Sequence, residues 1–156
     1  MHNKTIAHGC SFTRYKWPCW PKFVPWFNGG ITMLNKGRSA SGNETISRAA
    51  VNSAMKHKDI AHMYIMWSAV DRYEVITLDE GVDHLEGRIT YRVWDDDFKW
   101  STWFGGHRLP DKHEYYRRHF WNEQHQQYRT LEHIQRAQMF LNKKKIPYTM
   151  MIFNKD

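Results

Sequence analysis

Two turns of small residues, each directly after a short apolar run, lie near the start of the chain. Residues 4–8 precede the turn 9–13, and residues 31–34 precede the turn 35–44. Apolar runs that end in such turns are typical of buried strands in an α/β fold, which carries its chemistry at the carboxyl ends of the strands. The first turn offers the Ser11 hydroxyl, and the second offers glycine N–H groups at a helix start. This pattern predicts a nucleophile beside an oxyanion pocket.

The rest of the chain continues the alternation of strand and helix patterns. Apolar residues recur at helical spacing after Asn43, which we expect to cap a helix. Two further strands are predicted at 61–67 and 146–153, with a long helical pattern over 110–144 that breaks once near Asn122. We therefore expect one α/β domain over residues 1–156, a flavodoxin-like three-layer α/β/α sandwich with a short parallel sheet.

The segment 73–110 interrupts this alternation. It holds the acidic run Asp95, Asp96 and Asp97 together with several aromatic residues, and it shows no sustained apolar period. We expect a long insertion or lid with short hairpins, because long loops in compact domains are usually functional or mobile. Its aromatic residues are interpreted as packing the insertion, with a sugar-binding face as the alternative.

Composition limits the classes of partner. The chain has 156 residues, of which 41% are hydrophobic and 15% aromatic, enough for one core. No apolar run reaches the roughly 20 residues that span a bilayer, so we expect no membrane partner. The net charge of +7 favours anionic partners. However, apart from lysines 143–145 the basic residues are scattered, so we do not expect nucleic acid as the main partner.

We expect no metal or cofactor site from the cysteines, the histidines or the aromatic residues near the N-terminus. Cys10 and Cys19 match neither a zinc spacing nor a disulfide framework, so we expect two reduced thiols. The histidines of the long helical pattern are not spaced to converge as three or four metal ligands. We expect the aromatic residues of 12–27 to cover the core, and we expect no metal and no cofactor.

Several of these stretches carry a family resemblance. Residues 9–13 read Gly-Cys-Ser-Phe-Thr, residues 35–39 read Asn-Lys-Gly-Arg-Ser, and residues 65–68 read Ile-Met-Trp-Ser. They resemble the blocks of the SGNH (GDSL-like) hydrolases, in particular the branch encoded by tailed bacteriophages, including cyanophages. The resemblance implies that Ser11 is the nucleophile and that Gly37 donates a backbone N–H to the oxyanion.

The chain departs from the family pattern at three points. Cys10 stands where the family usually has aspartate, and no asparagine follows the third strand, so we expect Ser68 to donate in its place. The last block, Asp-x-x-His, which supplies the base, has no match after the last predicted strand. We therefore expect either a domain truncated at its C-terminus or a base from elsewhere. Asp59 and His62 match that block by letter, but they lie at the wrong end of the predicted sheet.

The resemblance implies a serine esterase that cleaves an acyl ester or a glycan O-acyl group. We expect weak or no activity, because losing members of such a catalytic unit costs several orders of magnitude in rate. The alternative is a catalytically silent phage structural or glycan-binding module, with virion proteins as partners. No secretory signal is visible, so we expect a location in the cytoplasm of an infected bacterium or in the virion. The pattern favours no particular oligomeric state.

Overall fold

Four parallel strands form the main sheet. The computed structural model describes residues 4–27, 30–39, 41–70, 72–76, 92–94, 99–104, 119 and 121–152. The sheet has the order β2-β1-β3-β7, and the parallel α/β class is therefore as predicted. Its strands are β1 (Lys4–His8), β2 (Met33–Asn35), β3 (Ile60–Trp67) and β7 (Tyr148–Ile152).

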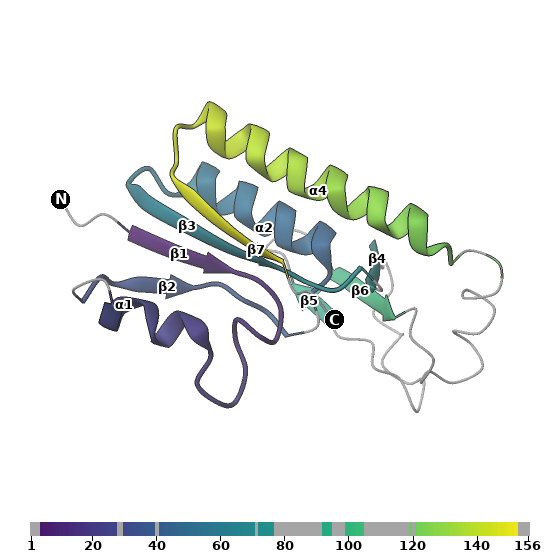
Figure 1. The fold of residues 1–156 in the computed structure, drawn as a ribbon, viewed down its shortest axis with the longest axis horizontal. Helices are drawn as coiled ribbons and strands as arrows, with labels where there is room; N and C mark the ends of the chain where they lie inside the picture. Colours follow the sequence, from purple (N-terminus) through teal and green to yellow (C-terminus); the bar gives the residue numbers. More distant parts are fainter. Residues whose placement is uncertain are drawn as a thin grey trace.

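Helices lie on both faces of this sheet. The long helices α2 (Asn43–Lys56) and α4 (Glu123–Lys143) cover one face side by side (Figure 1). The short elements η1 (Trp20–Lys22) and α1 (Val24–Phe27) lie toward the other face. There the Trp20 ring meets the Tyr64 ring of β3, with 6.0 Å between the centroids. This arrangement agrees with an α/β sandwich.

The core lies between the sheet and the long helices. Along β3 the nearly fully buried side chains are Met63, Ile65 and Trp67, and the residues between them are only half-buried. This alternation follows from the period of two in a strand. Ala50 of α2 and Ala137 of α4 are fully buried within the same cluster. The cluster also includes Cys10, Ile46, Ala54 and Leu141.

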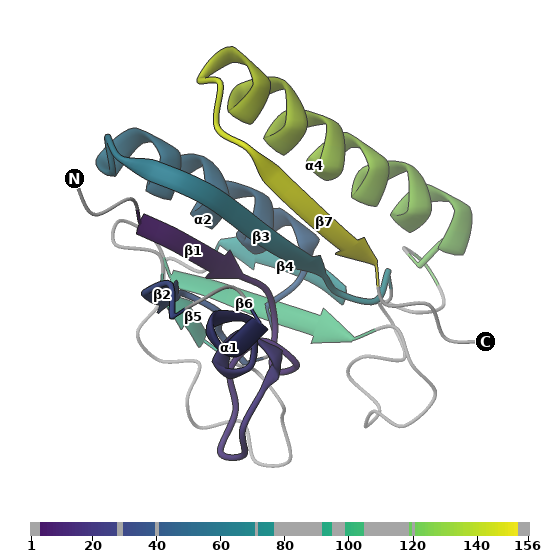
Figure 2. The same cartoon turned by 60° about the vertical axis from the view of Figure 1, so that its left-hand side comes forward.

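A second sheet falls mainly within the predicted insertion. It is antiparallel, with the order β4-β6-β5, and it is drawn in teal and green in Figure 2. Its strands are β4 (Arg72–Ile76), β5 (Arg92–Trp94) and β6 (Lys99–Phe104). The other residues of 73–110 lie outside the described part of the chain, so the role of a lid stays a prediction.

Two local predictions are wrong, and the second strand is present with different bounds. Asn43 is the first residue of α2, and Gly42 stands at the cap position. The Asn43 side chain does not cap the helix because it hydrogen-bonds the backbone of Ser68, directly after β3. The second strand is shifted toward the C-terminus relative to the predicted 31–34. The aromatic residues of 12–27 do not all cover the core, since Trp17 and Trp26 are 61% and 82% exposed. Pro18 and the neighbouring prolines restrict the connection between β1 and β2 to short helices. Such short helices do not turn every aromatic side chain toward the sheet.

Two further expectations concern the cysteines and the membrane. Cys10 and Cys19 are both buried and free, as predicted for reduced thiols. Cys19 Sγ lies 3.6 Å from the backbone oxygen of Ser11 and 3.4 Å from that of Trp17. Among the described residues, no helix combines the length and the apolar character needed to cross a membrane.

Candidate functional site

The three residues that the sequence singles out follow neighbouring strands. Ser11 comes after β1, Gly37 after β2 and Ser68 after β3. β1 lies between β2 and β3, so the chain passes from one side of β1 to the other at this edge. Such a switch point at the carboxyl ends of the strands is where open α/β sheets bind ligands. The structure therefore places all three turns at one edge of the sheet.

Glycines allow these turns to pack closely. A Cβ atom on Gly9 would collide with the Thr13 hydroxyl and with the carbonyl oxygen of Met66, and the φ angle of Gly9 is +156°. A Cβ atom on Gly37 would lie 2.7 Å from Thr13 Cβ. Thr13 is itself fully buried. Arg38 N also donates to Gly9 O at 2.9 Å. The turn after β1 therefore packs closely against the turn after β2 and the end of β3.

Asn35 connects the first two turns through its amide. Its Nδ2 donates to Thr13 O at 2.8 Å, and its Oδ1 accepts from Gly37 N at 2.9 Å. The Gly37 N–H is the group that the family resemblance assigns to the oxyanion. In this structure that donor already has a partner within the protein, so an incoming oxyanion must displace Asn35 Oδ1.

Ser11 is partly exposed at this edge. No hydrogen bond joins its hydroxyl to a histidine or a carboxylate of the described residues. A serine hydroxyl is a weak nucleophile until a neighbouring base takes its proton. His62, which matches the family's last block by letter, pairs in register with Thr5 and hydrogen-bonds Thr149 at 2.9 Å. It therefore lies toward the amino ends of the strands, away from Ser11.

The two most deeply buried histidines are also poor candidates for the base. Burial lowers the pKa of His8 to about 3, and the nearby charges of Lys36 and Arg38 act in the same direction. Burial is likewise the main cause that lowers the pKa of His133 to about 4. Both imidazoles are neutral at pH 7, and a base with a pKa this far below the working pH accepts a proton weakly.

Asn43 fixes the turn after β3. Its Oδ1 accepts from Ser68 N at 2.7 Å, and its Nδ2 donates to Ser68 O at 3.1 Å and to Thr130 Oγ1 at 3.1 Å. The Ser68 backbone groups are therefore committed to α2. The Ser68 hydroxyl is buried without a hydrogen-bond partner among the described residues. This hydroxyl is the group that remains for the donor role predicted for Ser68.

Glu74 of β4 occupies the N-terminus of α2. Its carboxylate accepts from Gly42 N at 2.7 Å and from Thr45 N at 2.8 Å. A helix leaves its first N–H groups unpaired, and its dipole favours a negative charge there. Burial nevertheless raises the pKa of Glu74, and the charge of Glu44 adds to that increase. Glu74 joins the second sheet to the same edge of the main sheet.

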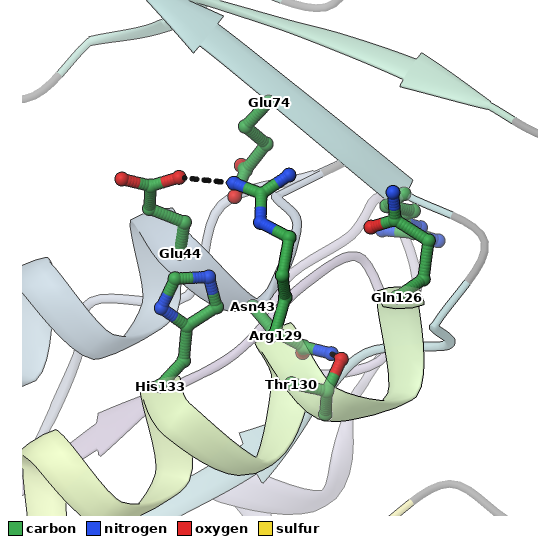
Figure 3. A pocket seen from close by; sticks show the side chains of 8 residues that line it. Asn43, Glu44, Glu74, Gln126, Arg129, Thr130 and His133 are labelled. Carbon is green, nitrogen blue, oxygen red and sulfur yellow. Dashed lines mark hydrogen bonds and ion pairs between the residues drawn. The ribbon is translucent and has the colours of Figure 1, made fainter. Parts of the chain in front are cut away.

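A small polar cavity lies where α2, α4 and β4 meet (Figure 3). Arg129 reaches across it to Glu44, with Nη2 3.0 Å from Oε2, and its guanidinium lies 4.6 Å from the centre of the Tyr73 ring. The cavity volume of about 10 Å³ leaves room for about one water molecule. It is too small for an organic ligand, so we interpret this cluster as a joint that holds α4 and β4 against α2.

The structure thus adds Asn35, Asn43 and Glu74 to the residues that shape this edge. Asn35 stands two positions before a glycine, which is a recognisable turn signal. Asn43 and Glu74 act on partners far along the chain, and no local pattern marks those contacts.

Neither a cluster of metal ligands among the described residues nor a matching family adds to this description of the edge. Within the described ranges, no three histidine, cysteine, aspartate or glutamate side chains gather as metal ligands. Comparison of the chain with protein-family models and with curated proteins finds no match.

Proposed function

We propose that this chain is an SGNH-type binding module that holds an acyl ester or an acylated glycan near Ser11 without efficient hydrolysis. The observation that carries the proposal is the hydrogen bond from Gly37 N to Asn35 Oδ1 at 2.9 Å. Ester hydrolysis depends on preorganised donors aimed at the position of the developing oxyanion. Because this donor is already paired, the transition state gains little from it, whereas binding of the ground state does not need it.

The position and chemistry of the edge support a polar ligand there. Ser11 offers a partly exposed hydroxyl, which can donate to an ester carbonyl. Lys36 is exposed and Arg38 is partly exposed on the adjacent turn, so the edge also carries positive charge. These groups stand at the switch point of the sheet, the usual ligand position in this class of fold.

The test measures binding and cleavage in the same samples. The probe is an O-acetylated xylo-oligosaccharide, with the chemically deacetylated compound as control. Ligand-observed NMR reports binding, and the acetate signal reports hydrolysis. We expect the wild type and Ser11→Ala both to bind the acetylated probe, Ser11→Ala more weakly because it lacks the hydroxyl donor, with acetate released at the uncatalysed rate in both samples. The proposal is wrong if neither protein binds, or if the wild type releases acetate and Ser11→Ala does not.

A working serine esterase is the second candidate. It is favoured by the position of Ser11 on the turn directly after β1, at the edge where α/β enzymes carry their chemistry. This function requires that the Asn35–Gly37 hydrogen bond opens when substrate binds, and that a base approaches Ser11. Acetate release that disappears in Ser11→Ala is the result that selects it.

The resemblance to phage-encoded proteins extends the proposal to location and partners. We place the protein in the cytoplasm of an infected bacterium or in the virion, with virion proteins as neighbours. Peptide mass spectrometry of purified particles, compared with the lysate of the infected cells, distinguishes the two locations.

A further inference from the structure

The connection between β1 and β2 carries a surface that the proposed function does not use. Among the described aromatic side chains, six are at least 43% exposed, and five of these lie between residues 12 and 26. Exposed apolar groups that are contiguous in space mark interaction sites more often than scattered ones do. We call this segment the Phe12–Trp26 surface, and its exposed rings are Phe12, Tyr15, Trp17, Phe23 and Trp26.

Four of these rings form two pairs on a fixed support. Tyr15 and Trp17 have centroids 4.1 Å apart, and Phe23 and Trp26 have centroids 6.2 Å apart. Trp20 lies between the pairs in sequence and anchors the segment. Its Nε1 donates to Thr13 Oγ1 at 3.3 Å, and its ring meets Tyr64 of the sheet. The rings are therefore presented to solvent by a segment that is tied to the sheet.

Positive charge alternates with the rings. Arg14 and Lys16 flank Tyr15, and Lys22 directly precedes Phe23; all three basic side chains are exposed. The printed sequence has no aspartate or glutamate before Glu44, so nothing acidic within this segment offsets the charge.

Within the described residues, no ion pair joins Arg14, Lys16 or Lys22 to an acidic side chain. The ion pairs of Glu44 with Arg48 and with Arg129 lie elsewhere in the fold. Both belong to the α2–α4 joint. The cations of the Phe12–Trp26 surface are therefore available to an external anion.

We propose that the Phe12–Trp26 surface binds single-stranded nucleic acid. Proteins that hold single strands combine cations, which follow the phosphates, with aromatic rings, on which successive bases stack. Both components are present here in alternation. A neutral glycan would leave the cations unused. An acidic polysaccharide could pair with the cations and lay its sugar rings on the aromatic side chains, and competition by heparin is the result that would reveal it. Single-stranded nucleic acid uses both components through its phosphates and its stacked bases, and its binding does not depend on Ser11.

The test uses fluorescence anisotropy of a labelled oligothymidylate about 15 nucleotides long, within the usual site size of such proteins. The variants Trp17→Ala and Trp26→Ala each remove one exposed ring, and Tyr128→Ala removes the exposed aromatic ring on α4 as the matched control. We expect each tryptophan variant to weaken binding about 5- to 150-fold, the range for loss of one stacked base. Tyr128→Ala should bind like the wild type. Circular dichroism melting should be unchanged in all three, because the rings are exposed.

Salt dependence tests the cations separately. With three contacts to phosphates, the slope of log K against log salt should be about −2, and Arg14→Ala/Lys16→Ala should reduce its magnitude by about 1.4. Lys143→Ala/Lys144→Ala removes equal charge from the end of α4 and should leave the slope unchanged. An abasic oligomer of the same length should compete poorly. Equal competition by that oligomer or by heparin, unaltered binding by both tryptophan variants, or no binding at low salt would each overturn the proposal.

Discussion

Asn35 Oδ1 accepts a hydrogen bond from Gly37 N at 2.9 Å, and the amide nitrogen of the same side chain donates to Thr13 O at 2.8 Å. One side chain thus sets the distance between the turns after β1 and β2. It also satisfies the donor that an SGNH-type oxyanion pocket needs. The geometry of this edge and its expected lack of hydrolysis therefore depend on the same residue.

We predict that Asn35→Ala lowers the free energy of unfolding by about 1–2 kcal/mol, because it removes two part-buried hydrogen bonds. Asn35→Asp keeps an acceptor for Gly37 but places a carboxylate oxygen against Thr13 O, so this isosteric variant should also be less stable than the wild type. Urea denaturation at pH 7 measures both variants. Equal stability of Asn35→Ala and the wild type would show that the amide does not join the turns.

Asn43 should matter more for stability, since it is buried and holds both backbone groups of Ser68. We expect Asn43→Ala to lower the free energy of unfolding by about 2–4 kcal/mol, because buried backbone groups lose their partners. Thr130→Val removes only the hydrogen bond between Asn43 and Thr130, and it should cost about 1 kcal/mol. Similar losses in the two variants would contradict the role assigned to the Ser68 contacts.

Glu74 should give stability a pH dependence of its own. Its pKa in the folded protein is raised above the ordinary value of 4.5, mainly by burial. From pH 4.5 up to the raised pKa, the folded state binds more protons than the unfolded state, so this contribution falls as pH increases. In Glu74→Gln the side chain does not titrate. It has only one acceptor oxygen for the N–H groups of Gly42 and Thr45, so one of these groups faces the amide nitrogen and loses its hydrogen bond. We expect the variant to be less stable by about 1–3 kcal/mol.

Denaturation of the Glu74→Gln variant and the wild type between pH 4.5 and 7 tests this prediction. The difference in stability between the two proteins should shrink as pH rises, because only the wild type loses the protonated carboxyl. A difference that stays constant across this range would contradict the raised pKa of Glu74 in the folded protein.

His8 should act in the opposite direction on acidification. Its pKa is about 3 in the folded protein and about 6.5 when unfolded, so between these values the unfolded state binds the extra proton. Stability is then lost as pH falls below 6.5, with a limiting slope of about 1.4 kcal/mol per pH unit. His8→Leu should show a shallower slope, although His133 still contributes with the same sign. An unchanged slope in His8→Leu would exclude His8 as a source of the acid sensitivity.

Much of the fold follows from local patterns in the sequence. The apolar run at 4–8 coincides with β1, and the helical spacing after Asn43 coincides with α2. Such periods reflect which face of an element is buried, and the sequence displays that directly. β4, β5 and β6 were expected only as short hairpins, because their segment has no sustained apolar period.

The site was predictable only where its residues are local turn features. Ser11 and Gly37 stand in small-residue turns after apolar runs, and the sheet order brings those turns to one edge. The partners of Asn43 lie 25 and 87 positions away in the sequence, and those of Glu74 lie 29 and 32 positions away. Contacts of that kind are set by the packing of whole elements, so composition and spacing do not specify them.

The Phe12–Trp26 surface shows how an average can hide a local feature. The net charge of +7 is spread over the whole chain, which suggested scattered solvated residues. The absence of aspartate and glutamate before Glu44 and the exposure of Trp17 and Trp26 indicate a binding surface only when they are taken together. Exposure depends on the tertiary structure, and aromatic residues near prolines are equally compatible with a core.

The most direct test of the central claim is intact-mass labelling with a fluorophosphonate, which reacts with activated serines. The wild type, Ser11→Ala and an active serine hydrolase as positive control are treated in parallel. We predict an adduct on the positive control and none on either form of this protein. A single adduct on the wild type that is lost in Ser11→Ala would contradict the account, because it would show that Ser11 has an effective base.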